Sequence, residues 1–180
     1  VPETLDSIGD NALYNTSLEK IFIPRNVVYV GDRSLSIPAL KEAIFAPAVA
    51  PVGYNAFVYA DNVTIYVPDY EGYSKNSSLA YFASKMKPMV TAETSEFEKE
   101  KDESIAPKFS CNIPGYKLVN IDLSTLDSSV GNHHANLEAS FEGERNFTTS
   151  IGFDYQVKEI DTGVDNVSVS PSVLIRGGKG

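Results

Sequence analysis

From Val1 to Pro68 the sequence repeats itself with a fixed period of 22 residues and without gaps. Apolar and glycine positions recur at this spacing: Leu5, Val27 and Val49; Ile8, Val30 and Val52; Gly9, Gly31 and Gly53; Ala12, Ser34 and Ala56; Leu13, Leu35 and Phe57; Ile21, Ala43 and Ile65; Ile23, Phe45 and Val67. Periods of about 20 to 29 residues are typical of solenoids, in which each unit is too small to bury its apolar face alone. The period therefore predicts a stack of repeats.

Each unit is expected to contain one short strand. In the first unit Leu18, Ile21 and Ile23 follow the pattern L-x-x-I-x-I and lead into Pro24. This alternation predicts a strand that ends at the proline, because proline has no N–H group with which to continue a ladder. Pro68 marks the same point in the third unit. The recurring glycine follows an inward aliphatic residue, which indicates either a turn with positive φ or a close approach of two backbones.

These residues resemble the leucine-rich repeats of bacterial BspA-type surface proteins, whose units read roughly I-G-x-x-A-F and then L-x-x-I-x-I-P. The first unit carries the pattern at Ile8–Leu13 and Leu18–Pro24, and the third at Val52–Phe57 and Ile65–Pro68. Three residues depart from it, namely Ser34 for alanine, Ala46 for proline and Asn62 for leucine. The resemblance implies a parallel-strand solenoid, a location outside the cell or on its outer surface, and a role in adhesion.

After the repeats, helix spacing replaces strand spacing. Leu79, Phe82 and Ala83 fall on one helical face with Met86 one turn further on, and Asn76 or Ser77 is the expected N-cap. Residues 69–86 also resemble the helical cap that closes such arrays, so we expect the array and its cap to span residues 1–88. The acidic, polar residues 89–107 are then predicted to form a solvated linker.

The remaining residues, 108–180, have the alternation of short β-strands. The predicted strands are Tyr116–Leu123, Asn136–Glu142 and Phe147–Lys158, with shorter runs at 167–169 and 173–175. The pattern predicts an antiparallel sandwich, and residues 121–141 resemble the immunoglobulin-like modules of bacterial surface proteins. The expected fold class is mostly β with a little helix.

Charge and hydropathy exclude some partners. The net charge of -9 and the pI near 4.7 argue against nucleic acid and anionic lipid, both of which attract basic proteins. No apolar run is long enough to insert this fragment into a membrane. Val1-Pro2 occupy the repeat position of Ile23-Pro24, so we expect further repeats before Val1, with any signal or anchor also outside the fragment.

Residues that carry chemistry are sparse. His133 and His134 are adjacent, without a second ligand pair nearby, and Cys111 is the single cysteine. The turn Asp161–Asn166 has carboxylates but not the spacing of a calcium loop. We therefore expect no catalytic residues, no metal, no cofactor and no enzymatic activity.

The strand register predicts one candidate binding face. If Ile21 and Ile23 point inward, alternation directs their neighbours to the outer face, and the same applies in the next two units. The predicted binding residues are Lys20, Phe22, Glu42, Ile44, Thr64 and Tyr66. Exposed apolar stripes of this kind mark contact sites, unless another segment, such as the linker, covers them.

The leading functional hypothesis is a non-enzymatic, secreted or surface-exposed protein that adheres to host or neighbouring-cell proteins. A second hypothesis is carbohydrate binding, in which Tyr54, Tyr66 or other exposed aromatic rings stack on sugars. A third is a passive spacer. The ligand itself has no signature in the sequence.

Overall fold

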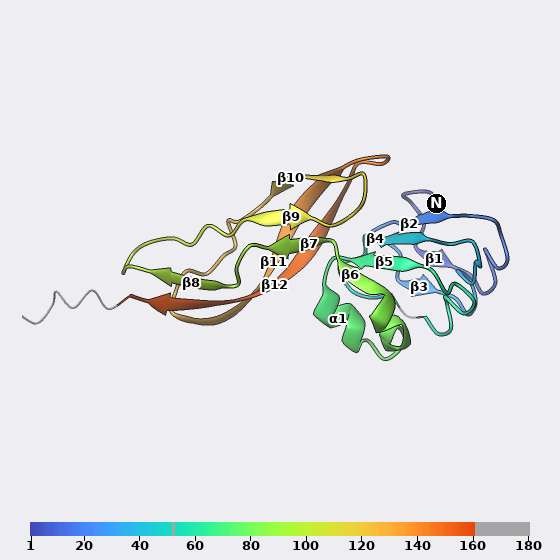
Figure 1. The fold of residues 1–180 in the computed structure, drawn as a ribbon, viewed down its shortest axis with the longest axis horizontal. Helices are drawn as coiled ribbons and strands as arrows, with labels where there is room; N and C mark the ends of the chain where they lie inside the picture. The colour runs from blue at the N-terminus through green and yellow to red at the C-terminus, as the bar shows by residue number, and fades with distance from the viewer. Residues whose placement is uncertain (52, 161–180) are drawn as a thin grey trace, which may run out of the picture.

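The computed structural model describes residues 1–51 and 53–160, and Figure 1 shows the repeats and a second, β-rich part arranged end to end along the long axis. Val52, the predicted strands at 167–169 and 173–175, and the end of the predicted 108–180 module lie outside the described residues. We call residues 1–68 the repeat stack and residues 89–160 the second module.

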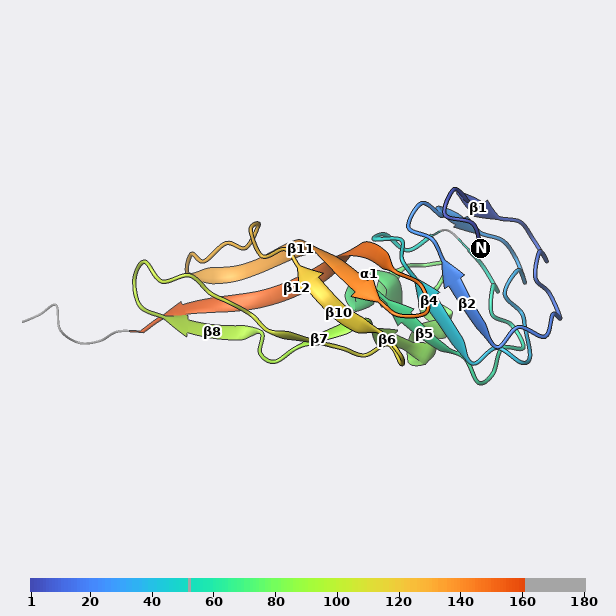
Figure 2. The same ribbon diagram turned by 90° about the horizontal axis from the view of Figure 1, so that it is seen from above.

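A parallel sheet forms one side of the repeat stack and continues beyond it into β6, in the order β2-β4-β5-β6 (Figure 2). Its strands are β2 (Lys20–Ile23), β4 (Glu42–Phe45), β5 (Thr64–Val67) and β6 (Met86–Pro88). Lys20 pairs with Glu42 and Glu42 with Thr64, so the 22-residue period is the register of the sheet. The strands β2 and β5 end directly before Pro24 and Pro68, which confirms the predicted strand ends.

The inward aliphatic positions also line up. The short strands β1 (Ser7–Ile8) and β3 (Tyr29–Val30) pair in parallel, with Ile8 opposite Val30. The Gly31 amide donates to the Ile8 carbonyl at 2.7 Å. These contacts place equivalent residues of the first two repeats in one row.

The recurring glycine is explained by close backbone approach rather than by positive φ. A Cβ on Gly31 would lie 2.4 Å from the Asp10 backbone nitrogen, and one on Gly53 would lie 2.4 Å from the Val30 carbonyl oxygen. A residue in the left-handed conformation stands two positions later in every repeat, at Asn11 (φ 57°), Arg33 (φ 52°) and Asn55 (φ 51°). This second periodic backbone feature was not predicted.

The repeat core consists of the inward residues, most of which are fully enclosed; it comprises Ile8, Ile21, Ile23, Val27, Val30, Leu35, Ile37, Leu40, Ala43, Phe45, Ala56, Phe57, Ala60, Val63, Ile65 and Val67. Where Ala46 replaces the proline of the repeat pattern, its N–H donates to the Ile23 carbonyl at 2.9 Å, a bond that proline cannot form.

The predicted helical cap is present but is divided into two short helices. The first, α1 (Tyr70–Lys75), begins at the N-cap Asp69, and the second, η1 (Ala80–Lys85), is a 3-10 helix. Asn76, a predicted N-cap, accepts hydrogen bonds from the amides of Ser78 and Leu79 in the turn between them. The buried cap residues Tyr73, Leu79, Phe82 and Met86 extend the repeat core.

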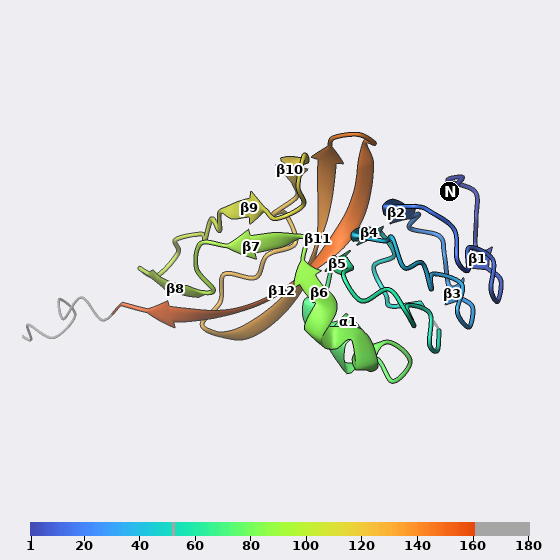
Figure 3. The same cartoon turned by 45° about the vertical axis from the view of Figure 1, so that its right-hand side comes forward.

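The second module contains two sheets. One has the order β10-β11-β12-β8, and the other pairs β7 with β9. The strands are β7 (Val90–Ala92), β8 (Glu96–Lys99), β9 (Phe109–Cys111), β10 (Lys117–Ile121), β11 (Gly131–Glu142) and β12 (Phe147–Glu159). Figure 3 shows the strands of both sheets. Rings from the two sheets meet, as in the contact of Phe109 with Phe153 at 5.1 Å between centroids.

The structure corrects two predictions about this part. Residues 89–107 are not a linker throughout, because β7 and β8 belong to the sheets of the second module. Phe97, flanked by glutamates, packs its ring 6.5 Å from that of Phe153. The sheet is also not wholly antiparallel, because β8 runs parallel to β12.

Candidate binding site

The six predicted binding residues lie in two rows across the parallel sheet. One row holds Phe22, Ile44 and Tyr66, and the other holds Lys20, Glu42 and Thr64, each residue opposite its counterpart on the next strand. We call these two rows the outer strand face. Their order follows from the 22-residue register and from the alternation of side chains along a strand.

Much of the outer strand face is covered by the second module. Ile44 is 4% exposed and Tyr66 is 5% exposed. They belong to a shared apolar cluster with Ala46, Met89, Val90, Ile113, Ala139, Phe141, Phe147 and Ile151, and Phe22 packs against it. Of the two alternatives left open by the sequence, cover by another segment holds for Ile44 and Tyr66: the aromatic side chains of β11 and β12, and not the linker alone, cover the sheet there.

Aromatic and polar contacts hold the second module on this face. The Phe147 ring lies 5.0 Å from that of Phe22 in an edge-on arrangement, and 4.8 Å from Phe141 in a stack. The Thr149 hydroxyl, fully buried, donates to the Ala46 carbonyl at 2.6 Å. Burial raises the pKa of the Tyr66 phenol, and the negative charge of Glu42 raises it further.

An arginine on each side extends the contact. Arg25 of the repeat stack donates to both carboxylate oxygens of Glu138, at 3.2 and 3.3 Å. Arg145, in the turn between β11 and β12, donates to the Val1 carbonyl at 3.0 Å and to Glu3 at 3.3 Å. Its guanidinium also lies 4.7 Å from the centroid of the Phe22 ring, within the range of a cation–π interaction.

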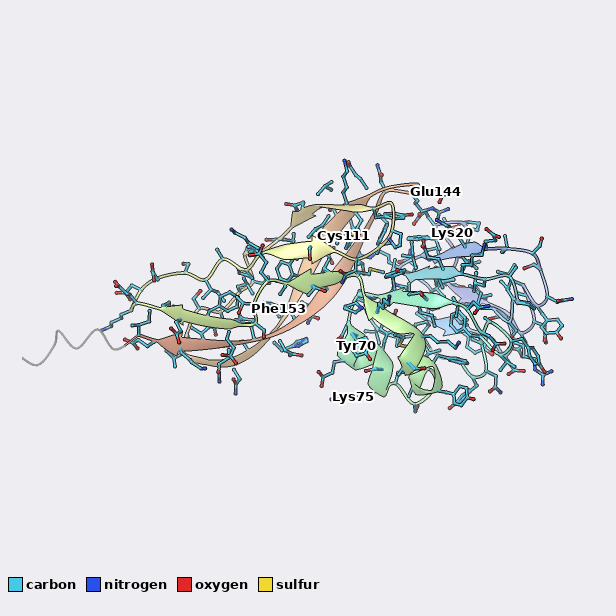
Figure 4. The ribbon with its side chains drawn as sticks, viewed as in Figure 1. Lys20, Tyr70, Lys75, Cys111, Glu144 and Phe153 are labelled. Carbon is cyan, nitrogen blue, oxygen red and sulfur yellow. The ribbon has the colours of Figure 1, made fainter. Side chains whose placement is uncertain are left out.

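A groove remains open between β2 and the turn of the β11–β12 hairpin. It has a volume of about 730 Å³, and we call it the β2 groove. Four of the six predicted residues line it, together with residues of the first repeat and of the second module: Lys20, Phe22, Glu42, Ile44, Leu5, Ile8, Leu13, Leu18, Ile21, Tyr116, Glu144 and Arg145. Lys20 on β2 and Glu144 in the hairpin turn, both labelled in Figure 4, line it from the two sides.

The β2 groove has an apolar floor and a charged border. Leu18 is 40% exposed, although its counterpart in the second repeat, Leu40, is fully buried. The Lys20 ammonium lies 3.9 Å from a Glu42 carboxylate oxygen. The Lys20 side chain is 59% exposed and that of Glu42 only 12% exposed, so the cation of this pair faces solvent. The groove can therefore bind a partly apolar ligand and orient it by charge.

The histidines and the cysteine, considered above as candidate metal ligands or reactive groups, make contacts within the fold. The His134 ring contacts Asp154 at 2.7 Å, a hydrogen bond that raises the pKa of His134. His133 stacks on Tyr155 at 5.1 Å between centroids. Burial raises the pKa of the half-buried Cys111 thiol. Within residues 1–51 and 53–160, no group of metal-ligating side chains is assembled, and the turn Asp161–Asn166 lies outside the described residues.

Sequence reasoning missed the groove residues that come from the second module. Tyr116, Glu144 and Arg145 lie more than 90 residues after β2 in the chain, and no periodic pattern relates them to the repeats. The only signal in the sequence was the turn Gly143–Asn146 between two predicted strands.

Comparison with known families identifies the repeats. Residues 1–84 match the family model described as "BspA type Leucine rich repeat region (6 copies)". This part of the chain is therefore a BspA-type leucine-rich repeat region, which indicates a role in binding proteins or surfaces. No curated protein and no solved structure matched the chain. Among the described residues, no helix is long and apolar enough to cross a membrane.

Proposed function

We propose that this chain is a non-enzymatic binding protein that acts outside the bacterial cell and attaches it to proteins of a host or of neighbouring cells. The family of the repeats supports a binding role, because leucine-rich-repeat regions are generally binding modules without catalysis. Adhesion and a location outside the cell go further than this family role, and we propose them for the whole chain.

The β2 groove is the observation that carries the proposal. The second module covers Ile44 and Tyr66, so the middle of the outer strand face is closed to a partner. The groove instead combines an exposed leucine, an aromatic ring and both signs of charge, the composition of a protein interface with an apolar centre and a polar edge.

We further propose that the chain divides after Pro88 into a solenoid of repeats with its cap and an immunoglobulin-like module. The two parts share a core, because Met89 and Val90 pack with Ile44 and Tyr66. In this arrangement the second module fixes one wall of the β2 groove, and both parts contribute to binding.

The test is a binding screen with two matched variants. The purified chain is applied to an array of extracellular-matrix and cell-surface proteins, alongside Leu18→Arg and Val49→Arg. Both substitutions place the same cation at an exposed apolar position, but only Leu18 lines the β2 groove. We expect Leu18→Arg to weaken binding by about tenfold or more, and Val49→Arg to bind as the parent does. Equal binding by both variants, or binding to no protein, would contradict the proposal.

Carbohydrate binding remains a second candidate because several tyrosine rings are exposed, among them Tyr54. Tyr54 is 61% exposed, whereas Tyr66, the other named tyrosine, is enclosed and has no free face for a sugar. A glycan array tests this candidate: binding that Tyr54→Ser abolishes and Leu18→Arg leaves unchanged favours carbohydrate over protein.

A further inference from the structure

Two residues at the same position of the repeat contact the outward side of the β11–β12 hairpin. Arg25 and Asp69 are two periods apart, and each follows the proline that ends a strand. Arg25 binds the carboxylate of Glu138. Asp69, the N-cap of α1, lies so close to β12 that a Cβ on Gly152 would be 2.8 Å from its carboxylate carbon. The cap and the hairpin therefore touch at Gly152.

The cross-strand pair of His134 and Asp154 stands beside this contact. It is the next pair along the hairpin on the same side, because Gly152 pairs with Asn136 and side chains alternate along a strand. Two residues of a strand span about 7 Å, so Asp69 lies near the pair. The His134 ring nitrogen Nδ1 contacts the Asp154 carboxylate at 2.7 Å. One imidazole is thus close to a carboxylate from the cap and to a carboxylate from β12.

The neighbouring charged side chains of the described residues belong to ion pairs of their own. These pairs are Lys75–Glu71 on the cap, Lys158–Glu96 between β12 and β8, and Arg25–Glu138. The pKa of Lys75 is raised mainly by its bond to Glu71 and further by the charge of Asp154, so Lys75 also faces the hairpin. A neutral His134 leaves Asp69 and Asp154 as neighbouring like charges, whereas a protonated His134 supplies a cation to both.

Both carboxylates favour the protonated form of the histidine. The hydrogen bond to Asp154 is the largest cause of the raised pKa of His134, and the negative charge of Asp69 raises this pKa as well. A coupling free energy between two groups is reciprocal. Because Asp69 stabilises the proton on His134, that proton stabilises the approach of Asp69, and with it the contact between the cap and the hairpin.

We propose that the contact between the cap and the β11–β12 hairpin is proton-linked, so that protonation of His134 holds the second module more firmly against the cap. Because the folded-state pKa of His134 is raised, the added attraction is complete below about pH 6.5 and is lost as the pH rises through the raised value. The His134 side chain is 48% exposed, so the effect is small, about twofold in the equilibrium between a closed and a loosened contact. This linkage acts whatever ligand the chain binds.

The test is the pKa of His134, measured by nuclear magnetic resonance of the intact chain between pH 5.5 and 8.5. Asp69→Asn removes the charge but keeps a side-chain oxygen that can accept from the Gly72 amide, so the N-cap is preserved. Asp61→Asn is the matched control, because it makes the same change at an exposed aspartate that has no influence on the pKa of His134. His133, on the opposite side of β11, is the internal reference.

We expect Asp69→Asn to lower the pKa of His134 by about 0.3, which is a twofold change in its protonation equilibrium. Asp61→Asn should leave this pKa unchanged, and neither variant should alter the titration of His133. An unchanged pKa of His134 in Asp69→Asn, or the same decrease in both variants, overturns the proposal.

Gly152→Ala separates the contact from the charge. Its Cβ would push the Asp69 side chain away from β12 without removing a carboxylate, so the pKa of His134 should fall as it does in Asp69→Asn. Ser150→Ala, at the preceding outward position of β12, is the control and should not lower this pKa. If Gly152→Ala does not fold, Asp69→Asn decides the outcome alone.

Hydrogen exchange measures the firmness of the contact itself. The Met89 amide donates to the Val67 carbonyl at 2.9 Å, where the second module begins. Relative to its intrinsic rate, this amide should exchange about twofold more slowly at pH 5.5 than at pH 8.5 in the parent, and this pH dependence should disappear in Asp69→Asn. Equal protection of the Met89 amide at both pH values in the parent would contradict a proton-linked contact.

Discussion

At the scale of single residues, the approach of one repeat to the next depends on a glycine and on the left-handed residue two positions after it. Gly31 and Gly53 lie against the backbone of the preceding repeat, which leaves no space for a Cβ. Asn11 and Asn55 adopt the left-handed conformation readily, as short polar side chains do, whereas Arg33 occupies the same position with a longer one.

Replacing Gly31 by alanine should destabilise the fold by about 2 kcal/mol or more, because the new Cβ would collide with backbone atoms of Gly9 and Asp10. Gly9→Ala is the matched control, since a Cβ there meets no atom within 4 Å. The free energy of unfolding in urea measures both. A similar loss for the two variants would show that close approach is not the reason for the glycine.

Replacing Ser34 by alanine should stabilise the protein by about 1 kcal/mol. The Ser34 hydroxyl oxygen is buried and has no hydrogen-bond partner among the described residues, and the other two repeats carry alanine at this position. Ser36→Ala is the control, because its hydroxyl donates to the Ala56 carbonyl at 3.3 Å and its removal should destabilise. Thermal unfolding of the two variants should shift in opposite directions.

At the scale of elements, the hairpin of β11 and β12 joins the second module to the repeats. In its contacts with the repeats, the Thr149 hydroxyl donates a hydrogen bond to the Ala46 carbonyl, and the Phe147 ring packs edge-on against the Phe22 ring. Because Ala46 stands where the repeat pattern has proline, the strand ladder continues one residue further at this point. The hairpin therefore packs against a segment that departs from the repeat pattern.

Substituting Thr149 by valine should lower the free energy of unfolding by about 1 to 2 kcal/mol, because the buried Ala46 carbonyl loses its donor. Thr148→Val removes a hydroxyl from the neighbouring residue, where it is exposed and accepts a hydrogen bond from Arg25. This variant should lower the free energy of unfolding by less. Urea unfolding compares the variants; a larger loss for Thr148→Val would contradict the buried contact.

The same hairpin has a pH-dependent contact between His134 and Asp154. The hydrogen bond that the His134 ring donates to the Asp154 carboxylate raises the folded-state pKa of His134 above about 6.5, so its stabilisation is complete below that pH and is lost as pH rises through the raised value. The His134 side chain is 48% exposed, which limits the effect to a few tenths of a kcal/mol. Unfolding between pH 5.5 and 8.5 should show this loss in the parent and not in Asp154→Asn.

The sequence predicted strands correctly where apolar residues recur at a fixed spacing, and it missed strands where they do not. The register of β2, β4 and β5 follows from the 22-residue spacing, and the rows of the outer strand face follow from alternation. The strand β8 was missed because Glu96 and Glu98 favoured a solvated segment over an edge strand, although Phe97 between them has the spacing of a half-buried strand. Local composition does not reveal which strand will be its neighbour.

At the scale of the whole molecule, the second module determines which part of the outer strand face stays exposed. Sequence patterns order the residues of the outer strand face but do not show that aromatic side chains more than 70 residues away, such as Phe141 and Phe147, cover it. The β2 groove exists because this cover stops at β2, where Arg145 and Glu144 form the opposite wall. In the proposed function, binding through this groove would depend on both parts of the chain.

The most direct measurement of this arrangement is hydroxyl-radical footprinting of the intact chain, read by mass spectrometry at individual side chains. Tyr66 should be protected, while Tyr54 and Tyr81, which are 61% and 87% exposed, react readily. Leu18 in the β2 groove should also react, and Leu40, its buried counterpart, should not. Reaction of Tyr66 at the rate of Tyr54 would contradict the account, because the outer strand face would then be open to solvent.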